Sequence, residues 1–205
     1  MQKREIIIML LLKTELNLLK SQINPHFFFN TLNNLYGLAV EKSDKTEHVI
    51  HKLAEMMRFT IYDGRKDSVS IKDELNYLNN YVELNMLRYQ NTVDIQIQKD
   101  IENENQRIPP LLFINLLENA FKHGAESIID CAYIRYKLKT TSKKIEFEIE
   151  NNFELTKPKK HAGIGMENLR RRLDLLFPDR HEFTVEISES VYKTKVSIYL
   201  TWTTS

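Results

Sequence analysis

The sequence predicts an α+β protein in which an N-terminal helical hairpin precedes a layered domain with a mixed sheet. Two observations predict this class. Apolar residues recur with the helical period of 3.6 up to about Tyr89, and after that they alternate with the strand period of 2. Two expected helices, at 110–123 and 166–177, interrupt the alternating runs, which favours helices on one side of a sheet over a doubly wound fold. The alternating runs are 93–97, 133–138, 145–149, 183–187 and 196–200.

The helical part is expected to contain three helices, at 11–40, 46–62 and 70–89. Ser70 and Asp73 form a short capping box at the start of the third helix, and Gly64 ends the second. The first two helices are too apolar to bury their inner faces within one hairpin. We therefore expect a homodimer through residues 11–64, in which two hairpins form a four-helix bundle. The polar link after Gly64 divides the chain into two domains, 1–66 and 67–205.

A histidine stands at the start of an amphipathic stretch in the first helix. Its apolar stripe consists of Phe28, Leu32, Leu35 and Ala39, whereas the upstream seam of Leu12, Leu16, Leu19 and Ile23 points to the other side of the helix. Pro25 separates the two stretches and is expected to kink the helix. His26 and Asn30 face away from the second stripe and are i, i+4 neighbours, so the amide can orient an exposed imidazole. A histidine in this position is either an ordinary surface residue or a reactive one.

A polar stripe runs along the expected helix at 110–123, which is otherwise apolar. The stripe consists of Asn115, Glu118, Asn119, Lys122 and His123. It is either a solvated face or a ligand site. Asparagine is a poor helix former, which favours a ligand site. Amide oxygens, a carboxylate and a cation suit Mg²⁺ and phosphate.

Gly163 and Gly165 precede the helix expected at 166–177. Free backbone N–H groups at the start of that helix would face an anion held by the glycines. The polar segment 153–162 is expected to be a flexible lid. The arginines 170–172 form either a solvated face or a set with one member that reaches phosphate or a partner.

These motifs together resemble those of the LytS/YehU-type sensor histidine kinases. The string Gln22-Ile-Asn-Pro-His-Phe-Phe-Phe-Asn-Thr-Leu-Asn-Asn34 resembles their phospho-acceptor box. The polar stripe resembles the N-box of the Bergerat-fold (GHKL) ATPases and kinases, and Gly163 and Gly165 resemble their second glycine box. The resemblance covers nearly the whole chain and implies a Bergerat-type α/β sandwich that binds ATP and Mg²⁺.

The resemblance also implies roles for individual residues. His26 would be the phospho-acceptor, and Asn119 the Mg²⁺ ligand. The further ATP contacts it implies come from Asn115, Lys122, His123, Gly163, Gly165 and Asn168.

The sequence departs from the family pattern at two places. Asn151 and Phe153 stand where the Bergerat fold has Asp-x-Gly, so adenine would be bound by a neutral amide. Phe27 stands where many kinases have an acidic residue after the histidine. The proton from His26 would then pass to Glu118 or to water, with Asn30 as an orienting residue.

The resemblance therefore predicts an ATP-dependent protein-histidine kinase. It would transfer a phosphoryl group from Mg·ATP to His26 and then to an aspartate in the receiver domain of a response regulator. The alternatives are a scaffold or phosphatase-only module of the same fold, and an ATP hydrolase in which Glu118 activates water.

Composition sets limits on partners and compartment. The 29 basic and 28 acidic residues nearly cancel, which argues against nucleic acid. Cys131, expected in a strand, is the single cysteine and fits the cytoplasm. The apolar run 6–12 is shorter than the ~20 residues that span a bilayer, and no signal-peptide cleavage site follows it. That run is either the end of a coiled coil or a stub below a sensor segment that lies outside this chain and could anchor the full-length protein in the inner membrane.

Overall fold

The computed structural model describes residues 25–89, 93–125, 131–154 and 164–200, with no description of the side chains of Pro25 and Ile164. The helices are α2 (Pro25–Val40), α3 (Lys45–Ile61), α4 (Ile71–Arg88), α5 (Ile114–Ala120) and α6 (Ile164–Leu176), with a 3₁₀ turn η1 (Asp63–Arg65) and a π-helical segment η2 (Phe121–Ala125). The strands are β1 (Val69–Ser70), β2 (Asp94–Ile101), β3 (Arg107–Ile108), β4 (Tyr133–Thr140), β5 (Lys144–Asn152), β6 (His181–Ile187) and β7 (Val191–Tyr199).

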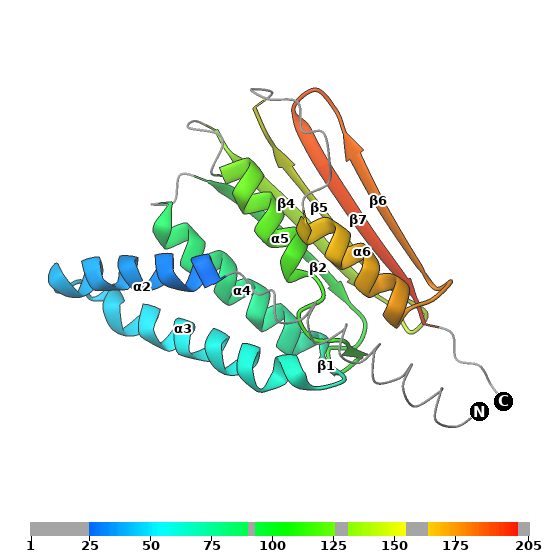
Figure 1. Ribbon diagram of the computed structural model, residues 1–205, viewed down its shortest axis with the longest axis horizontal. Helices are drawn as coiled ribbons and strands as arrows, with labels where there is room; N and C mark the ends of the chain where they lie inside the picture. The colour runs from blue at the N-terminus through cyan, green and yellow to red at the C-terminus, as the bar shows by residue number, and fades with distance from the viewer. Residues whose placement is uncertain (1–24, 90–92, 126–130, 155–163, 201–205) are drawn as a thin grey trace.

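The main sheet has five strands in the order β2-β4-β5-β7-β6. The pair β2 and β4 is parallel and the other pairs are antiparallel, so the sheet is mixed. Helices α5 and α6 lie side by side over one face of this sheet, and α4 lies between the sheet domain and the hairpin of α2 and α3 (Figure 1). The expected α+β class with a mixed sheet is confirmed.

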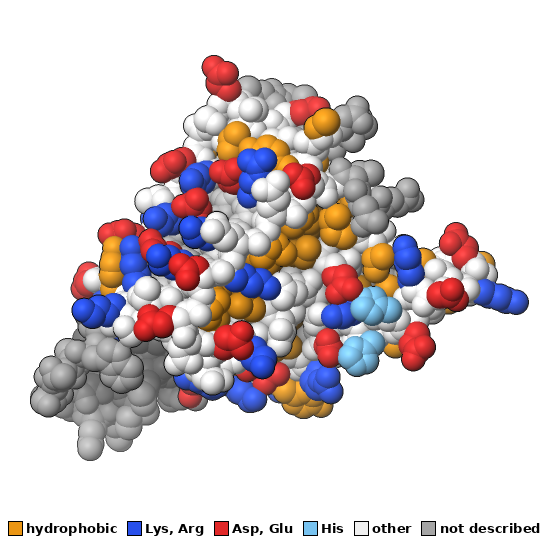
Figure 2. Space-filling model, turned by 180° about the vertical axis from the view of Figure 1, so that it is seen from behind, with side chains coloured by type: hydrophobic (Ala, Val, Ile, Leu, Met, Phe, Trp, Pro, Cys, Tyr) orange, Lys and Arg blue, Asp and Glu red, His pale blue; other side chains and the backbone are white. Residues whose placement is uncertain are grey.

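The other face of the sheet is covered by charged side chains that alternate in sign from strand to strand. Register places Arg135 opposite Glu150, and Glu148 opposite Lys195. Ion pairs join Arg135 to Glu150 at 3.4 Å and Lys193 to Glu148 at 2.8 Å. Figure 2 shows the same interleaving of acidic and basic side chains, so this face compensates its own charge.

The hairpin helices bury only part of the apolar faces that their sequences offer. On α2 the buried residues are Phe27 and Thr31, whereas Leu32 of the expected stripe is 47% exposed. On α3 the residues Val49, Leu53, Met56 and Phe59 are buried, whereas Ile50, Met57 and Ile61 are exposed. The reason is that both helices pack on α4 with one face, and each keeps a second apolar face that the described elements leave exposed.

Helix α5 begins later than its sequence predicts. The helix starts at Ile114, whereas Pro110 was expected to open it. The segment before it is a loop in which Leu111 has a φ of 57°, a left-handed conformation that is unfavourable for leucine. The loop is held by the carboxylate of Glu74, which accepts hydrogen bonds from the backbone N–H groups of Leu111, Leu112 and Phe113.

Other local expectations have mixed outcomes. The capping box of Ser70 and Asp73 at the start of α4 is present as expected. Cys131 does not lie in a strand: it is exposed, just before β4. The upstream seam, the kink before Pro25, Gly163 and most of the expected lid lie outside the described residues. Among the helices of the described segments, none has the length and apolar character that a membrane span requires.

Candidate functional site

His26 lies in the first turn of α2 with its imidazole exposed. The side-chain nitrogen of Asn30 lies 3.2 Å from Nδ1 and 3.3 Å from Nε2 of His26. The amide therefore lies against the ring, as the i, i+4 spacing predicts. Since a neutral imidazole has one acceptor nitrogen, the amide N–H of Asn30 can donate to that nitrogen and hold the ring in one orientation.

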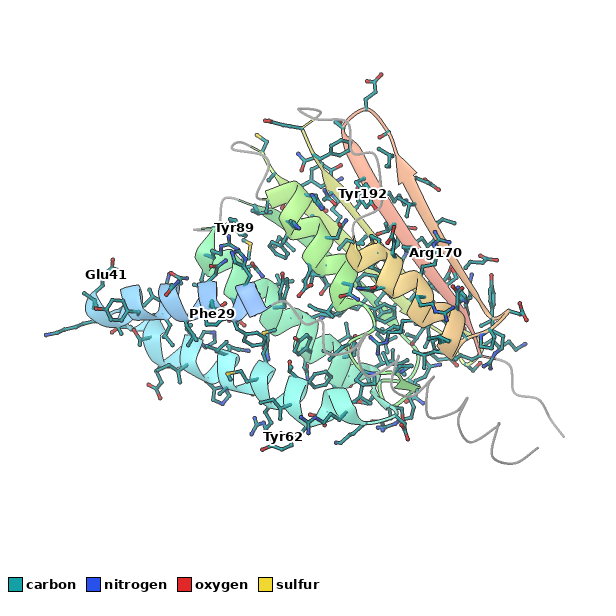
Figure 3. The ribbon with its side chains drawn as sticks, in the orientation of Figure 1. Phe29, Glu41, Tyr62, Tyr89, Arg170 and Tyr192 are labelled. Atoms are coloured by element: carbon teal, nitrogen blue, oxygen red, sulfur yellow. The ribbon has the colours of Figure 1, made fainter. Side chains whose placement is uncertain are left out.

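Phe27, the next residue, is buried and connects the histidine to the sheet domain. Its ring lies 4.5 Å from that of Tyr81 on α4. Tyr81 in turn meets Phe121 edge to face at 5.7 Å, and Phe121 stacks on Tyr89 at 6.0 Å. Figure 3 labels Tyr89 at the end of α4. Because Phe121 directly follows α5, the three rings of Phe27, Tyr81 and Phe121 join the start of α2 to the end of α5.

Helix α5 carries the polar stripe on its less buried side. Asn115, Glu118 and Asn119 are half-buried, whereas Leu116, Leu117 and Ala120 between them are buried. The π-helical segment continues the stripe, with Lys122 exposed and His123 half-buried. The five residues expected to form a stripe are thus brought together along one helical segment, and their roles stay predictions.

Glu118 acts electrostatically on the aromatic residues of α4. Burial raises the pKa of Tyr81 well above its ordinary value, and the negative charge of Glu118 raises it further. Burial also raises the pKa of Tyr77, and Glu118 again contributes. The carboxylate of Glu118 therefore lies within electrostatic range of the hydroxyl groups of Tyr77 and Tyr81.

The end of β5 meets the end of the polar stripe. Asn151 is buried, and its amide nitrogen donates to the carbonyl of Asn152 at 2.9 Å. A Cβ added to Gly124 would lie only 3.1 Å from the Cβ and Nδ2 atoms of Asn151, so glycine permits this close approach. Asn151, in the position expected to bind adenine, therefore packs directly behind Lys122 and His123.

Helix α6 packs beside α5. Gly165 is exposed in its first turn, and Asn168 is half-buried one turn later. Arg170, which is labelled in Figure 3, is exposed, and its guanidinium lies 4.9 Å above the ring of Phe183. Arg172 is almost fully buried, which the expectation of a solvated arginine face did not foresee.

Sequence reasoning missed three contributors to this site. Phe27 was noted only for the acidic residue it replaces, and nothing marked Tyr81 among the many aromatic residues of the chain. Glu74 gave no local signal because the N–H groups it binds are 37 to 39 residues away. One hint of an outside partner was available: the apolar helix follows two prolines, and its N-terminus has no side-chain cap of its own.

Comparisons with known proteins find similarity to histidine kinases. The family model described as histidine kinase matches residues 14–93. The sensor histidine kinase BtsS of Escherichia coli K12 is 27% identical over 194 residues, which cover 94% of this chain and 34% of that protein. The sensor protein LytS of Bacillus subtilis is 27% identical over 202 residues, which cover 92% of this chain and 34% of that protein. The resemblance to the LytS/YehU-type histidine kinases is thereby confirmed, and the chain spans about a third of the length of each relative.

A solved structure shares the fold. The histidine kinase domain of the blue-light activated kinase EL346 of Erythrobacter litoralis has a TM-score of 0.50. It is 12% identical to this chain and covers 91% of both chains. At this identity the likeness concerns the fold alone.

Proposed function

We propose that this chain, a relative of the LytS/YehU-type sensor histidine kinases, is a transmitter module that phosphorylates its own His26 from Mg·ATP. The phosphoryl group would then pass to an aspartate in the receiver domain of a response regulator. The division into an acceptor domain at 1–66 and a nucleotide domain at 67–205 is part of this proposal. The observation that carries it is the aromatic contact of Phe27, Tyr81 and Phe121, which joins the histidine to the end of the polar stripe.

The donor set fits Mg·ATP. The amides of Asn115 and Asn119 offer oxygen ligands on an otherwise apolar helix, and Lys122 offers an exposed cation for phosphate. Next to the stripe, Gly165 and Asn168 lie on α6, which packs beside α5. When bound, Mg·ATP supplies the phosphoryl group and neutralises part of its charge.

The residues of the chain itself would orient His26 and accept its proton. Asn30 contacts the imidazole and would present one ring nitrogen to the phosphorus atom. A nitrogen–phosphorus bond forms, the bond from phosphorus to the departing ADP breaks, and the ring loses its proton. Glu118 is the candidate acceptor because its charge lies close to Tyr81, the residue on which Phe27 packs. Water is the alternative acceptor.

The uncovered faces of the hairpin support a homodimer. Phe29, Leu32, Tyr36 and Val40 follow one another at spacings of three and four residues on α2, and each is at least 47% exposed. Ile50, Met57 and Ile61 on α3 are also exposed (the labels of Phe29 and Tyr62 in Figure 3 mark the two helices). A second copy of the hairpin would cover both faces as a four-helix bundle.

Two alternatives follow from the departures in the sequence. Asn151 donates its amide proton to a backbone carbonyl, a bond that an aspartate could not make, so the asparagine can be a structural residue. In that case the chain would be a scaffold or phosphatase-only module with weak nucleotide binding. An ATP hydrolase would instead use Glu118 to activate water.

Incubation with γ-labelled ATP and Mg²⁺ tests the proposal. Label that is acid-labile and alkali-stable should appear in the wild type and be absent in His26→Gln and Asn119→Ala. His51→Gln is the matched control because His51 is an exposed histidine on α3, and this variant should keep the label.

Each alternative has its own signature in the same assay. Binding of a fluorescent ATP analogue without label and with phosphate release would indicate a hydrolase. Absence of binding and of label would indicate a scaffold. Loss of phosphate from a phosphorylated response regulator, without any label on the chain, would indicate a phosphatase-only module.

A further inference from the structure

Two oppositely charged side chains meet at the loop that precedes α5, and both are buried. Glu74 on α4 has no exposed surface, and Arg172 on α6 is 2% exposed. Burying a charge is costly unless it is paired and hydrogen-bonded. This loop is the one place in the described segments where acidic and basic side chains are both almost fully removed from solvent.

The two side chains hold opposite sides of the same loop. The carboxylate of Glu74 accepts hydrogen bonds from the N–H groups of Leu111, Leu112 and Phe113 at 2.7, 2.7 and 3.1 Å. The guanidinium of Arg172 donates to the carbonyl of Leu111 at 2.5 Å and to the carbonyl of Pro110. The loop therefore has both its donors and its acceptors bound by charged groups, which form stronger hydrogen bonds than neutral ones.

Each charge moderates the cost of burying the other. Burial raises the pKa of Glu74, while the three N–H groups and the charge of Arg172 oppose that rise. Burial lowers the pKa of Arg172 to about 10, opposed by the charge of Glu74, so the guanidinium stays charged at neutral pH.

The loop is strained where the two groups hold it. Leu111, bound by Glu74 through its N–H and by Arg172 through its carbonyl, has the left-handed φ of 57°. Such a conformation persists only where its surroundings determine it strongly. Phe113 completes the attachment because its ring stacks on Phe147 of β5 at 4.6 Å.

We propose that Glu74 and Arg172 are positioning residues that set the polar stripe of α5 relative to helix α6. Asn115 is two residues after the last N–H held by Glu74, and Asn168 is one helical turn before Arg172. A displacement of either anchor would therefore move the two groups of candidate nucleotide ligands apart. This inference rests on the proposed function, since it assigns the pair a role in nucleotide binding.

A buried ion pair is weak evidence for stability, because apolar residues of similar volume often serve stability as well. The pair does fix the orientation of the loop, since each hydrogen bond requires a defined geometry. We therefore expect the pair to matter more for ligand geometry than for folding. Loss of residues that orient ligands from behind reduces affinity or activity by about 10- to 100-fold in comparable sites.

The test uses Glu74→Gln and Arg172→Lys. The glutamine keeps the shape and loses the charge, and the lysine keeps the charge and loses the two-pronged donor. Controls are Glu83→Gln, nine residues further along α4, and Arg170→Lys on α6; both residues are bound elsewhere, at His48 and Phe183. Titration with a fluorescent ATP analogue at several Mg²⁺ concentrations gives the dissociation constant separately from the fraction of active protein.

We expect the dissociation constant to rise about tenfold or more in both variants and to stay unchanged in both controls. Amide exchange at residues 111–113 should accelerate in Glu74→Gln. A purely structural pair would lower the fraction of active protein and leave the dissociation constant unchanged, which would overturn the inference. If the wild type does not bind the analogue while its amide exchange reports a folded protein, the proposed function fails and this inference fails with it.

Discussion

Replacement of Phe27 by alanine is expected to lower the free energy of unfolding by about 3 kcal/mol. The side chain is 5% exposed, and its ring lies 4.5 Å from Tyr81 and 5.4 Å from Phe28. A buried phenylalanine replaced by alanine costs about 3–5 kcal/mol, including the cavity that remains. The lower end applies because Phe27 lies in the first turn of α2, where the backbone can shift toward the space.

Urea unfolding at two protein concentrations measures this loss. Phe29→Ala is the matched control, since Phe29 is two residues along the same helix and 66% exposed. Phe27 packs on a residue of the same chain, so the loss of stability in Phe27→Ala should not depend on protein concentration. The proposed contact of Phe29 is with a second copy of the chain, so the loss of stability in Phe29→Ala should shrink on dilution toward the ±0.5 kcal/mol typical of surface positions. Phe27→Leu should recover most of the stability because the leucine refills most of the volume.

The reasoning would be refuted by a loss below about 1 kcal/mol for Phe27→Ala, because so small a loss is typical of surface positions and not of buried aromatic rings. It would also be refuted if the two alanine variants lost equal stability at the lower concentration. Either result would mean that α2 does not pack on α4 through Phe27 in solution.

Three further predictions concern the dimer, the start of α5 and the acid limit of stability. Tyr36→Glu places a charge on the uncovered face of α2, where Tyr36 is 73% exposed, and should convert a dimer to a monomer in light scattering. Gly64→Ala should lower the free energy of unfolding in urea by about 1–3 kcal/mol, because the new methyl carbon would lie 2.9 Å from the side chain of Leu111. Gly37 lies on α2 with open space around it, so Gly37→Ala should instead raise the free energy of unfolding by about 0.5–1 kcal/mol. The hydrogen bond from a lysine on the same strand holds the pKa of Glu146 below its ordinary value of 4.5, so its contribution is present above pH 4.5 and lost as the pH falls below it. Wild type and Glu146→Gln should therefore differ in urea midpoint at pH 7 and converge at pH 3.

The features that the sequence predicted well depend on neighbours along the chain. The capping box at the start of α4 is one example, because Ser70 and Asp73 are three residues apart and satisfy each other. The polar stripe of α5 is another, because the helical period alone puts Asn115, Glu118 and Asn119 on one side. The contact of Asn30 with His26 follows from the same spacing.

The features that the sequence did not predict depend on residues far along the chain. The buried face of α2 was predicted only in part: Phe28 and Leu35 pack partly against the core, whereas Leu32 is exposed. The helical period shows two apolar faces and does not say which of them packs on α4. The predicted start of α5 at Pro110 was wrong because Glu74, on α4, binds the backbone N–H groups of Leu111 and Leu112. These hydrogen bonds hold the residues after Pro110 in a loop. Asn151 is a similar case, since its contact with Gly124 depends on how β5 meets the π-helical segment.

Helix α4 is the element on which these distant contacts converge. Its surface holds α2 through Tyr81, the loop before α5 through Glu74, and the sheet through Asn79, which lies 3.4 Å from the hydroxyl of Tyr136. A fourth contact, from Glu83 to His48 at 2.5 Å, binds α3. Because one helix makes all four contacts, a displacement of α4 would act both on the helix that carries His26 and on the loop before α5.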